Sequence, residues 1–200
     1  MNFRIQIEYE GKLITTLRDI LPDKLMCLRM LIIGKRPALV SVEKRYYLQG
    51  RQGKMFWKYL SEYGLLNVTV GKYANEEKYE DEELLNHGFG ITDIVKVPGE
   101  AGTEPSNAEY RTGIDRVKEV IKEYSPSIVL FVYKGALDAW LKLVCGRKSK
   151  SIYGFNYDLE ALFGRKVFVF PMPGTPCKKE EAHRAMQELA NVMRVQRKPS

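Results

Sequence analysis

The feature that most limits the possible folds is an almost continuous apolar run at residues 127–133, SIVLFVY. A short run without polar alternation is typical of a parallel strand covered on both faces. Residues 107–124 and 136–144, on either side of it, have apolar side chains at helical spacing, and another buried strand follows at 167–170. Strands that alternate with helices predict a parallel sheet with helices on both faces and right-handed crossovers.

Weaker signals complete the prediction of a three-layer α/β/α fold with a mostly parallel sheet of about four strands. Apolar runs at 28–33 and 91–95 predict two of these strands. Residues 3–14 alternate apolar and polar side chains around Gly11, which predicts an N-terminal edge hairpin. We predict one domain over residues 1–200. Ser106 and Glu109 have the spacing of a capping box, and further helices are predicted at 54–63, before Gly64, and at 180–194.

The composition is that of a globular chain, with 44% hydrophobic and 28% charged residues in 200. The three cysteines, Cys27, Cys145 and Cys177, share no metal-type spacing, so we expect no metal and no other cofactor. Their odd number and scattered positions favour reduced thiols. The sequence contains no apolar stretch long enough for a signal peptide or a membrane span. We therefore expect a cytoplasmic protein, acting as a monomer and not at a membrane.

Most of the net charge of +7 lies in one segment. Residues 35–58 contain seven bases and one acid, Glu43, with tyrosines interleaved at 46–47. Cations contact phosphates and aromatic faces stack on unpaired bases, so this segment predicts a nucleic-acid-binding loop. We assign the Phe-Trp pair at 56–57 to the core of a helix. The segment 73–83, with six acids and one base, is predicted to be solvated surface that faces away from nucleic acid.

The predicted sheet has four loops at the carboxyl ends of its strands. Sheets of this class bind ligands at that edge. The loops read GKRPA at 34–38, KVPG at 96–99, KG at 134–135 and PMPGTP at 171–176. All four contain glycine or proline, which permit tight turns, although ordinary turns use the same residues.

Taken in order, these motifs resemble the uracil-DNA glycosylase superfamily, and most of all its branch of mismatch-specific uracil, thymine and hypoxanthine glycosylases. The resemblance covers residues 28–194. It implies an enzyme that flips a damaged or mismatched base out of duplex DNA and hydrolyses its N-glycosidic bond. The segments that carry it are LIIGKRPALVS, RYY, KMFWKYLSEYGL, GFGITD, LFVYKGA and VFVFPMPGTPC.

The resemblance also implies roles for particular residues. Tyr47 or Tyr46 would be the platform on which the flipped base stacks. The backbone of Gly34, Lys35, Arg36 and Pro37 would line the edge of the base, and the loop with Met172, Pro173, Gly174 and Thr175 would enter the gap left in the duplex. Bases expected to contact DNA are Lys44, Arg45, Arg51, Lys54, Lys134, Lys178 and Lys179.

Three positions depart from the family pattern. The place of the water-positioning residue, usually Asn, falls on Arg36, which has no hydrogen-bond acceptor and cannot be a general base. Met172 and Lys54 occupy two more positions where the family carries polar residues. A replacement acceptor is therefore needed near the pocket. Glu43 is one candidate, as the carboxylate of the basic segment, unless it merely pairs with a neighbouring base. Asp93, at a strand end, is the other, unless it is a turn residue.

Three functions remain open from the sequence. The first is an active DNA glycosylase for uracil or another deaminated or mismatched base. The second is a non-catalytic relative that binds nucleic acid, which the substitutions at Arg36 and Met172 favour. The third is an unrelated doubly wound protein that binds a small phosphorylated ligand. Against the third, no G-x-G-x-x-G motif follows a strand and no P-loop is present.

Overall fold

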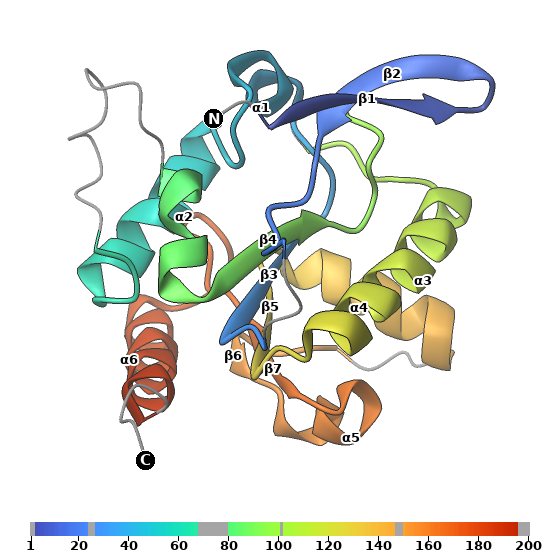
Figure 1. Cartoon of the computed structure of the whole chain (residues 1–200). Coiled ribbons are helices and arrows are strands. Elements are labelled where there is room, and N and C mark those ends of the chain that lie inside the picture. The colour runs from blue at the N-terminus through green and yellow to red at the C-terminus, as the bar shows by residue number, and fades with distance from the viewer. Residues whose placement is uncertain (1–2, 24–26, 68–79, 101, 147–149, 196–200) are drawn as a thin grey trace.

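Within the part of the chain that the structure describes, a five-stranded sheet forms the centre of the fold (Figure 1). The structure is a computed structural model, and it describes residues 3–23, 27–67, 80–100, 102–146 and 150–195. The strand order is β4-β3-β5-β7-β6; the first four are parallel, and the edge strand β6 is antiparallel. The predicted fold class is confirmed. The strands are β3 (Met30–Gly34), β4 (Phe89–Asp93), β5 (Ile128–Phe131), β6 (Gly154–Phe155) and β7 (Lys166–Val169).

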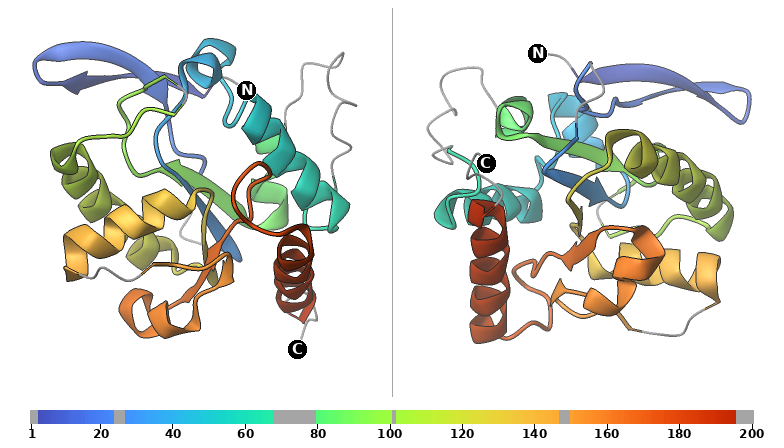
Figure 2. Two further views of the ribbon diagram at one scale, coloured as in Figure 1. Left: turned by 180° about the vertical axis from the view of Figure 1, so that it is seen from behind. Right: turned by 60° about the horizontal axis from the view of Figure 1, so that its bottom comes forward.

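The central strands send alternate side chains into two separate cores. In β3, Met30 and Ile32 belong to one core and Leu31 and Ile33 to the other, and all four are fully buried. Burial on both faces explains why these strands read as continuous apolar runs. Helices α2 and α6 cover the first face, and α3, α4 and α5 cover the second (Figure 2). The helices are α1 (Leu39–Lys44), α2 (Arg51–Glu62), α3 (Asn107–Tyr124), α4 (Lys134–Cys145), α5 (Glu160–Phe163) and α6 (Lys179–Val195).

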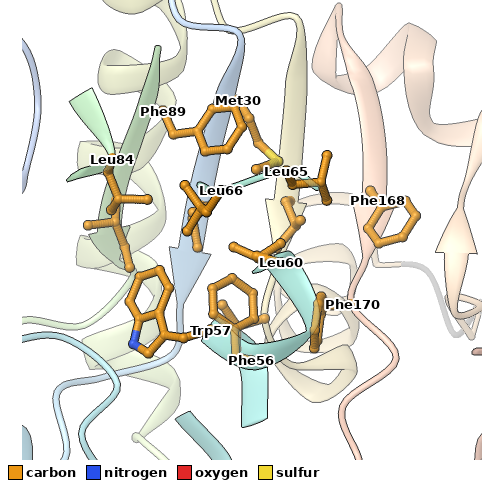
Figure 3. Close-up of a cluster of buried hydrophobic side chains, with 14 of the residues drawn as sticks. Met30, Phe56, Trp57, Leu60, Leu65, Leu66, Leu84, Phe89, Phe168 and Phe170 are labelled. Carbon is orange, nitrogen blue, oxygen red and sulfur yellow. The ribbon is translucent and has the colours of Figure 1, made fainter. Parts of the chain in front are cut away.

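Helix α2 anchors the first core through Phe56, Trp57 and Leu60, which are fully buried (Figure 3). The ring centroids of Phe56 and Phe170 are 4.6 Å apart. The assignment of the Phe-Trp pair to the core is therefore confirmed. The chain leaves the helix through Gly64, whose φ of +68° is the left-handed conformation that favours glycine after a helix.

The predicted capping box at the start of α3 is confirmed. Ser106 Oγ accepts a hydrogen bond from the amide of Glu109 at 3.2 Å, and Glu109 Oε2 accepts one from the amide of Ser106 at 2.7 Å. These two bonds satisfy amides that the first turn of a helix leaves free. They also fix the Glu109 carboxylate near the carboxyl edge of the sheet.

The N-terminal hairpin is confirmed and forms a two-stranded sheet of its own, β1 (Arg4–Tyr9) with β2 (Lys12–Leu17). Its turn places Glu10 and Gly11 at φ of 50° and 72°. The pairing continues three residues beyond the predicted end at residue 14. An isolated bridge between Ile20 and Ile91 joins the segment after the hairpin to β4. Figure 1 shows the hairpin projecting beyond the main sheet.

The fold differs from the predictions in several places. Strand β6 and helices α1 and α5 were not predicted, because all three are too short for a clear periodic pattern. Residues 73–79 of the acidic segment lie outside the described residues. For Asp81 the prediction of a solvated side chain is wrong, because Asp81 is fully buried and its Oδ2 accepts a hydrogen bond from the amide of Tyr47 at 2.7 Å. None of the described helices is both long and apolar enough to span a membrane.

Candidate active site

A pocket of about 330 Å³ opens at the carboxyl ends of β3, β4 and β5. The loop after β3, the segment 47–53 that leads into α2, and residues of the loop 99–103 form its walls. Asp93, the last residue of β4, and Tyr133, just after β5, also line it. The pocket therefore lies at the sheet edge where parallel α/β proteins bind ligands.

Asp93 contributes an ionisable group that is buried and incompletely bonded. The residue is 3% exposed, and within the described part of the chain its Oδ2 has no hydrogen-bond partner. Burial raises the pKa of Asp93 to about 7; the charges of Lys96 and Arg116 partly offset this effect, and that of Asp19 adds to it. A carboxyl group that titrates near neutral pH is suited to general acid–base chemistry.

Gly34 makes room for this carboxyl group. A Cβ atom at position 34 would lie 2.0 Å from Asp93 Oδ1, closer than any real contact. The residues are register partners at the ends of β3 and β4. A glycine is therefore required at the end of β3 for Asp93 to hold its position.

A network of charged side chains supports the end of β4. Asp19 accepts hydrogen bonds from Lys96 Nζ at 2.7 Å, from Arg116 at 2.6 Å and from Thr92 Oγ1 at 2.7 Å. Arg116 also donates to the carbonyl oxygen of Asp93. Burial alone would raise the pKa of Asp19, but the two cations and these hydrogen bonds lower it. Asp19 is therefore held as an anion.

The structure brings Tyr47, and not Tyr46, to the pocket. The Tyr47 ring is 2% exposed and lines the wall, and its hydroxyl donates to the carbonyl of Arg18 at 2.9 Å. Burial raises the pKa of Tyr47 well above its ordinary value. Tyr46 instead packs edge-to-face on Phe3, with ring centroids 5.9 Å apart.

Arg36 lines the pocket but is held by the protein. Its Nε donates to the carbonyl of Val97 at 3.0 Å, and its Nη2 pairs with Glu109 Oε1 at 2.8 Å. Burial would raise the pKa of Glu109, but the bonds to Ser106 and Arg36 lower it. Beside it, Lys35 pairs with Glu104 at 2.8 Å. Pro37 also lines this wall.

Glu43 and the loop after β7 lie outside the pocket wall. Glu43 is exposed on α1 and is not among the residues that line the pocket. Met172 is 2% exposed and packs in the first core. Thr175 Oγ1 donates to the carbonyl of Met172 at 2.6 Å, closing a turn with Pro173 and Gly174, whose φ is +84°. Their roles stay predictions.

The predicted DNA-binding cations fall into two groups. Lys44, Arg45, Arg51 and Lys54 are exposed near the pocket, and Arg51 lines it. For these four, no ion pair occurs within the described residues. Lys178 and Lys179 are exposed at the start of α6, while Lys134 pairs loosely with Asp138 at 3.5 Å beside a second hollow of about 600 Å³.

The sequence reasoning missed Asp19, Lys96, Arg116 and Tyr133. Asp19 is 77 positions from Lys96 and 97 from Arg116, so no local spacing could signal their contact. Tyr133 could have been found, because it directly follows a predicted buried strand. Among the described residues, no cluster of His, Cys, Asp and Glu could hold a metal ion.

Comparison with known proteins agrees with this geometry. The profile of the UDG family, described as the uracil DNA glycosylase superfamily, matches residues 25–186. The chain belongs to the uracil DNA glycosylase superfamily. The resemblance that the order of motifs suggested is confirmed, and the hairpin and Asp19 precede the matched region.

One relative indicates a branch of the superfamily. A G/U mismatch-specific uracil DNA glycosylase of Schizosaccharomyces pombe is 28% identical to the chain over 141 residues. That match covers 70% of this chain but 42% of the relative. The chain therefore matches less than half of the relative's length, so similarity to the whole relative is not implied.

Proposed function

We propose that this chain is a DNA glycosylase that flips uracil, or another deaminated or mismatched base, out of DNA and hydrolyses its N-glycosidic bond. The observation that carries the proposal is Asp93, a buried carboxyl with an unpartnered oxygen in a pocket at the carboxyl edge of the sheet. Membership of the superfamily supports a DNA substrate. The relative named for G/U mismatches supports a deaminated base.

In this proposal Asp93, and not Glu43, is the acceptor that replaces the family's usual Asn. The ionised carboxylate takes a proton from water as the water attacks the sugar carbon of the flipped nucleotide. A group with a pKa of about 7 is partly ionised at neutral pH and binds a proton readily. Desolvation in the pocket strengthens this basicity.

The leaving base needs hydrogen-bond donors. Within the described residues, the backbone amides of Lys35 and Arg36 donate no hydrogen bond, and both residues line the pocket. Donors that are fixed before the reaction stabilise a developing anion without reorganisation. Tyr47 also lines the pocket and is the proposed stacking platform. The pocket volume of about 330 Å³ suits a small planar ligand.

The surface around the pocket supports DNA binding. The exposed cations Lys44, Arg45, Arg51 and Lys54 lie at the end of α1 and in the first turn of α2, and Arg51 lines the pocket. Cations without protein partners are free to contact phosphates. The three free thiols support the expected reducing, cytoplasmic compartment, and a monomer stays a prediction.

A second candidate is a non-catalytic relative that binds nucleic acid. Arg36 favours it, because the family resemblance puts Arg36 at the usual catalytic position, and its guanidinium is bonded to Val97 and Glu109. The buried Met172 also favours it. This candidate retains the exposed cations but gives Asp93 no chemical role.

The test is single-turnover incubation with labelled duplexes that contain uracil, thymine or hypoxanthine opposite each normal base. Alkaline cleavage reveals abasic sites. We expect excision of at least one base, a loss of about 10²–10⁴-fold in Asp93→Asn, and little change in Glu43→Gln. Glu43→Gln is the matched control, since it removes the same charge from an exposed helix.

Two outcomes would contradict the proposal. Salt-sensitive binding to these duplexes without any excision would favour the non-catalytic relative. Excision that survives in Asp93→Asn and disappears in Glu43→Gln would transfer the catalytic role to Glu43.

A further inference from the structure

The N-terminal arm, residues 3–20, is built into the wall of the pocket although it precedes the region matched by the superfamily profile. Leu17 lines the pocket directly. The carbonyl of Arg18 accepts the hydroxyl of Tyr47 at 2.9 Å, and Thr16 Oγ1 donates to the carbonyl of Lys96 at 2.5 Å. The arm therefore contacts the segments that carry the proposed platform and the end of β4.

Asp19 is the residue of the arm that forms ion pairs with both Lys96 and Arg116, the two cations whose charges act on Asp93. Its two oxygens accept separately, Oδ1 from Lys96 and Oδ2 from Arg116. In the described structure, neither Lys96 nor Arg116 donates a hydrogen bond to the Asp93 carboxylate. The one atom of Asp93 to which Arg116 donates there is the backbone carbonyl oxygen. Asp93 thus keeps an unpartnered oxygen, although the charges of Lys96 and Arg116 both act on its carboxyl group.

This arrangement is a competition between two carboxylates for the same cations. A buried carboxylate without a partner is unfavourable, and an ion pair with Lys96 or Arg116 would relieve it. Such a pair would occupy the acceptor oxygen and make Asp93 a weaker base. Lys96 and Arg116 instead pair with Asp19, whose carboxylate also accepts a hydrogen bond from Thr92.

We propose that Asp19 is a positioning residue for Asp93: it holds Lys96 and Arg116 away from the Asp93 carboxylate, and so makes the N-terminal arm a working part of the site. The significance for catalysis rests on the proposed glycosylase function. The charged or titratable groups around Asp93 are Asp19 from the arm, Lys35 and Arg36 after β3, Tyr47 before α2, Lys96 and Glu100 after β4, Arg116 on α3 and Tyr133 after β5.

The direction of each effect is set by these positions. Asp19→Asn removes a repelling charge and releases two cations toward Asp93, so the carboxyl should ionise at lower pH. Lys96→Met removes an attracting charge, so it should ionise at higher pH. Both directions follow from the charges around Asp93, because the Asp19 charge raises the pKa of Asp93 and the Lys96 charge lowers it. If Asp19 served folding alone, the Asp93 midpoint would not change in a folded Asp19→Asn variant.

The experiment is carboxyl-carbon NMR titration of the full chain, labelled at its aspartate side chains and without DNA. The Asp93 signal is identified by its absence from Asp93→Asn. We expect the midpoint to fall by about one to three pH units in Asp19→Asn and to rise by about one unit in Lys96→Met. Asp19→Glu, which keeps the carboxylate, should retain a midpoint nearer the unsubstituted protein.

An unchanged or higher midpoint in folded Asp19→Asn would overturn the proposal. Circular dichroism establishes whether that variant folds; if it does not, Lys96→Met decides, and an unchanged or lower midpoint overturns the proposal. The readout needs no cleavage. Expected shifts in a protein that excises no base would therefore reject the glycosylase and leave the coupling of Asp19 to Asp93 in place.

Discussion

The ends of β3 and β4 lie side by side at the pocket, yet within the described part of the chain the charged side chain near one end is hydrogen-bonded to the protein and the ionisable one at the other is not. After β3, Arg36 falls where the family resemblance predicts the usual catalytic residue, and its guanidinium is bonded to Val97 and Glu109. At the end of β4, Asp93 is buried with an unpartnered oxygen. The bonds of Arg36 give that side chain a structural role. An unpartnered buried carboxyl destabilises the fold, and such groups concentrate at functional sites.

The largest expected effect comes from closing the space between the two strand ends. Gly34→Ala puts a Cβ atom where Asp93 Oδ1 now lies, so the carboxyl must move. We expect excision to fall by at least about 100-fold, the lower range for losing a general base. Single-turnover rates measure it. Gly135→Ala is the matched control, because nothing lies within 4 Å of its Cβ position, and a similar loss there would contradict the assignment.

The pH dependence of excision shows whether Asp93 acts as a general base or as a general acid. Since the Asp93 pKa is about 7, the rate should rise about tenfold per pH unit below neutrality and level off above it. Single-turnover rates across this range measure the profile, with Glu43→Gln as a control that should keep it. A rate that falls as pH rises through 7 would instead mean that Asp93 works protonated.

Stability should change in the opposite direction to activity when Asp93 is replaced. The folded pKa of about 7 lies above the ordinary 3.8, so the folded protein holds this proton more tightly than the unfolded chain. The stability this contributes is present below about pH 4 and is lost as pH rises to 7. Asp93→Asn escapes that loss, and should be more stable by up to about 4 kcal/mol near pH 8 and by little near pH 4.

Urea unfolding at the two pH values measures this difference. Glu43→Gln, on an exposed helix, should show none. A variant Asp93→Asn that is less stable than the unsubstituted protein near pH 8 would mean that the carboxylate has partners the fold depends on.

We expect Arg36 to contribute to stability and not to catalysis. Glu109→Gln keeps the capping box, which accepts glutamine as well as glutamate, but removes the charge that holds Arg36. We expect a loss of about 1–2 kcal/mol in unfolding free energy, since a bond to a charged group is weakened. Urea unfolding measures the loss, and excision should fall far less than in Asp93→Asn. An equal fall in excision would make Arg36 a catalytic group.

The sequence predicted what depends on local pattern, and missed what depends on distant contacts. The run at 127–133, the Phe-Trp pair and the Ser106 box were found because burial and capping leave a periodic or fixed spacing. Asp93 was found as a strand end. Its unpartnered oxygen could not be found, because it depends on Asp19, which lies 97 residues from Arg116. Asp81 was missed for the same reason: it stands in an acidic run, yet it is buried and accepts a hydrogen bond from the amide of Tyr47, 34 residues away.

The smallest expected effect concerns Lys44, Arg45, Arg51 and Lys54, which unlike Arg36 form no ion pair within the described residues. Lys54 is exposed at the start of α2, so Lys54→Ala should weaken DNA binding for all sequences alike and lower the salt slope of log affinity by about one. Fluorescence anisotropy across a salt series measures the slope. Lys122→Ala is the matched control, because Lys122 is exposed near the end of α3, at the amino end of the sheet. There the carbonyl of Tyr124 accepts a hydrogen bond from the amide of Leu28. If both variants lower the slope equally, the cations around the pocket contribute only net charge, and DNA need not lie over Asp93.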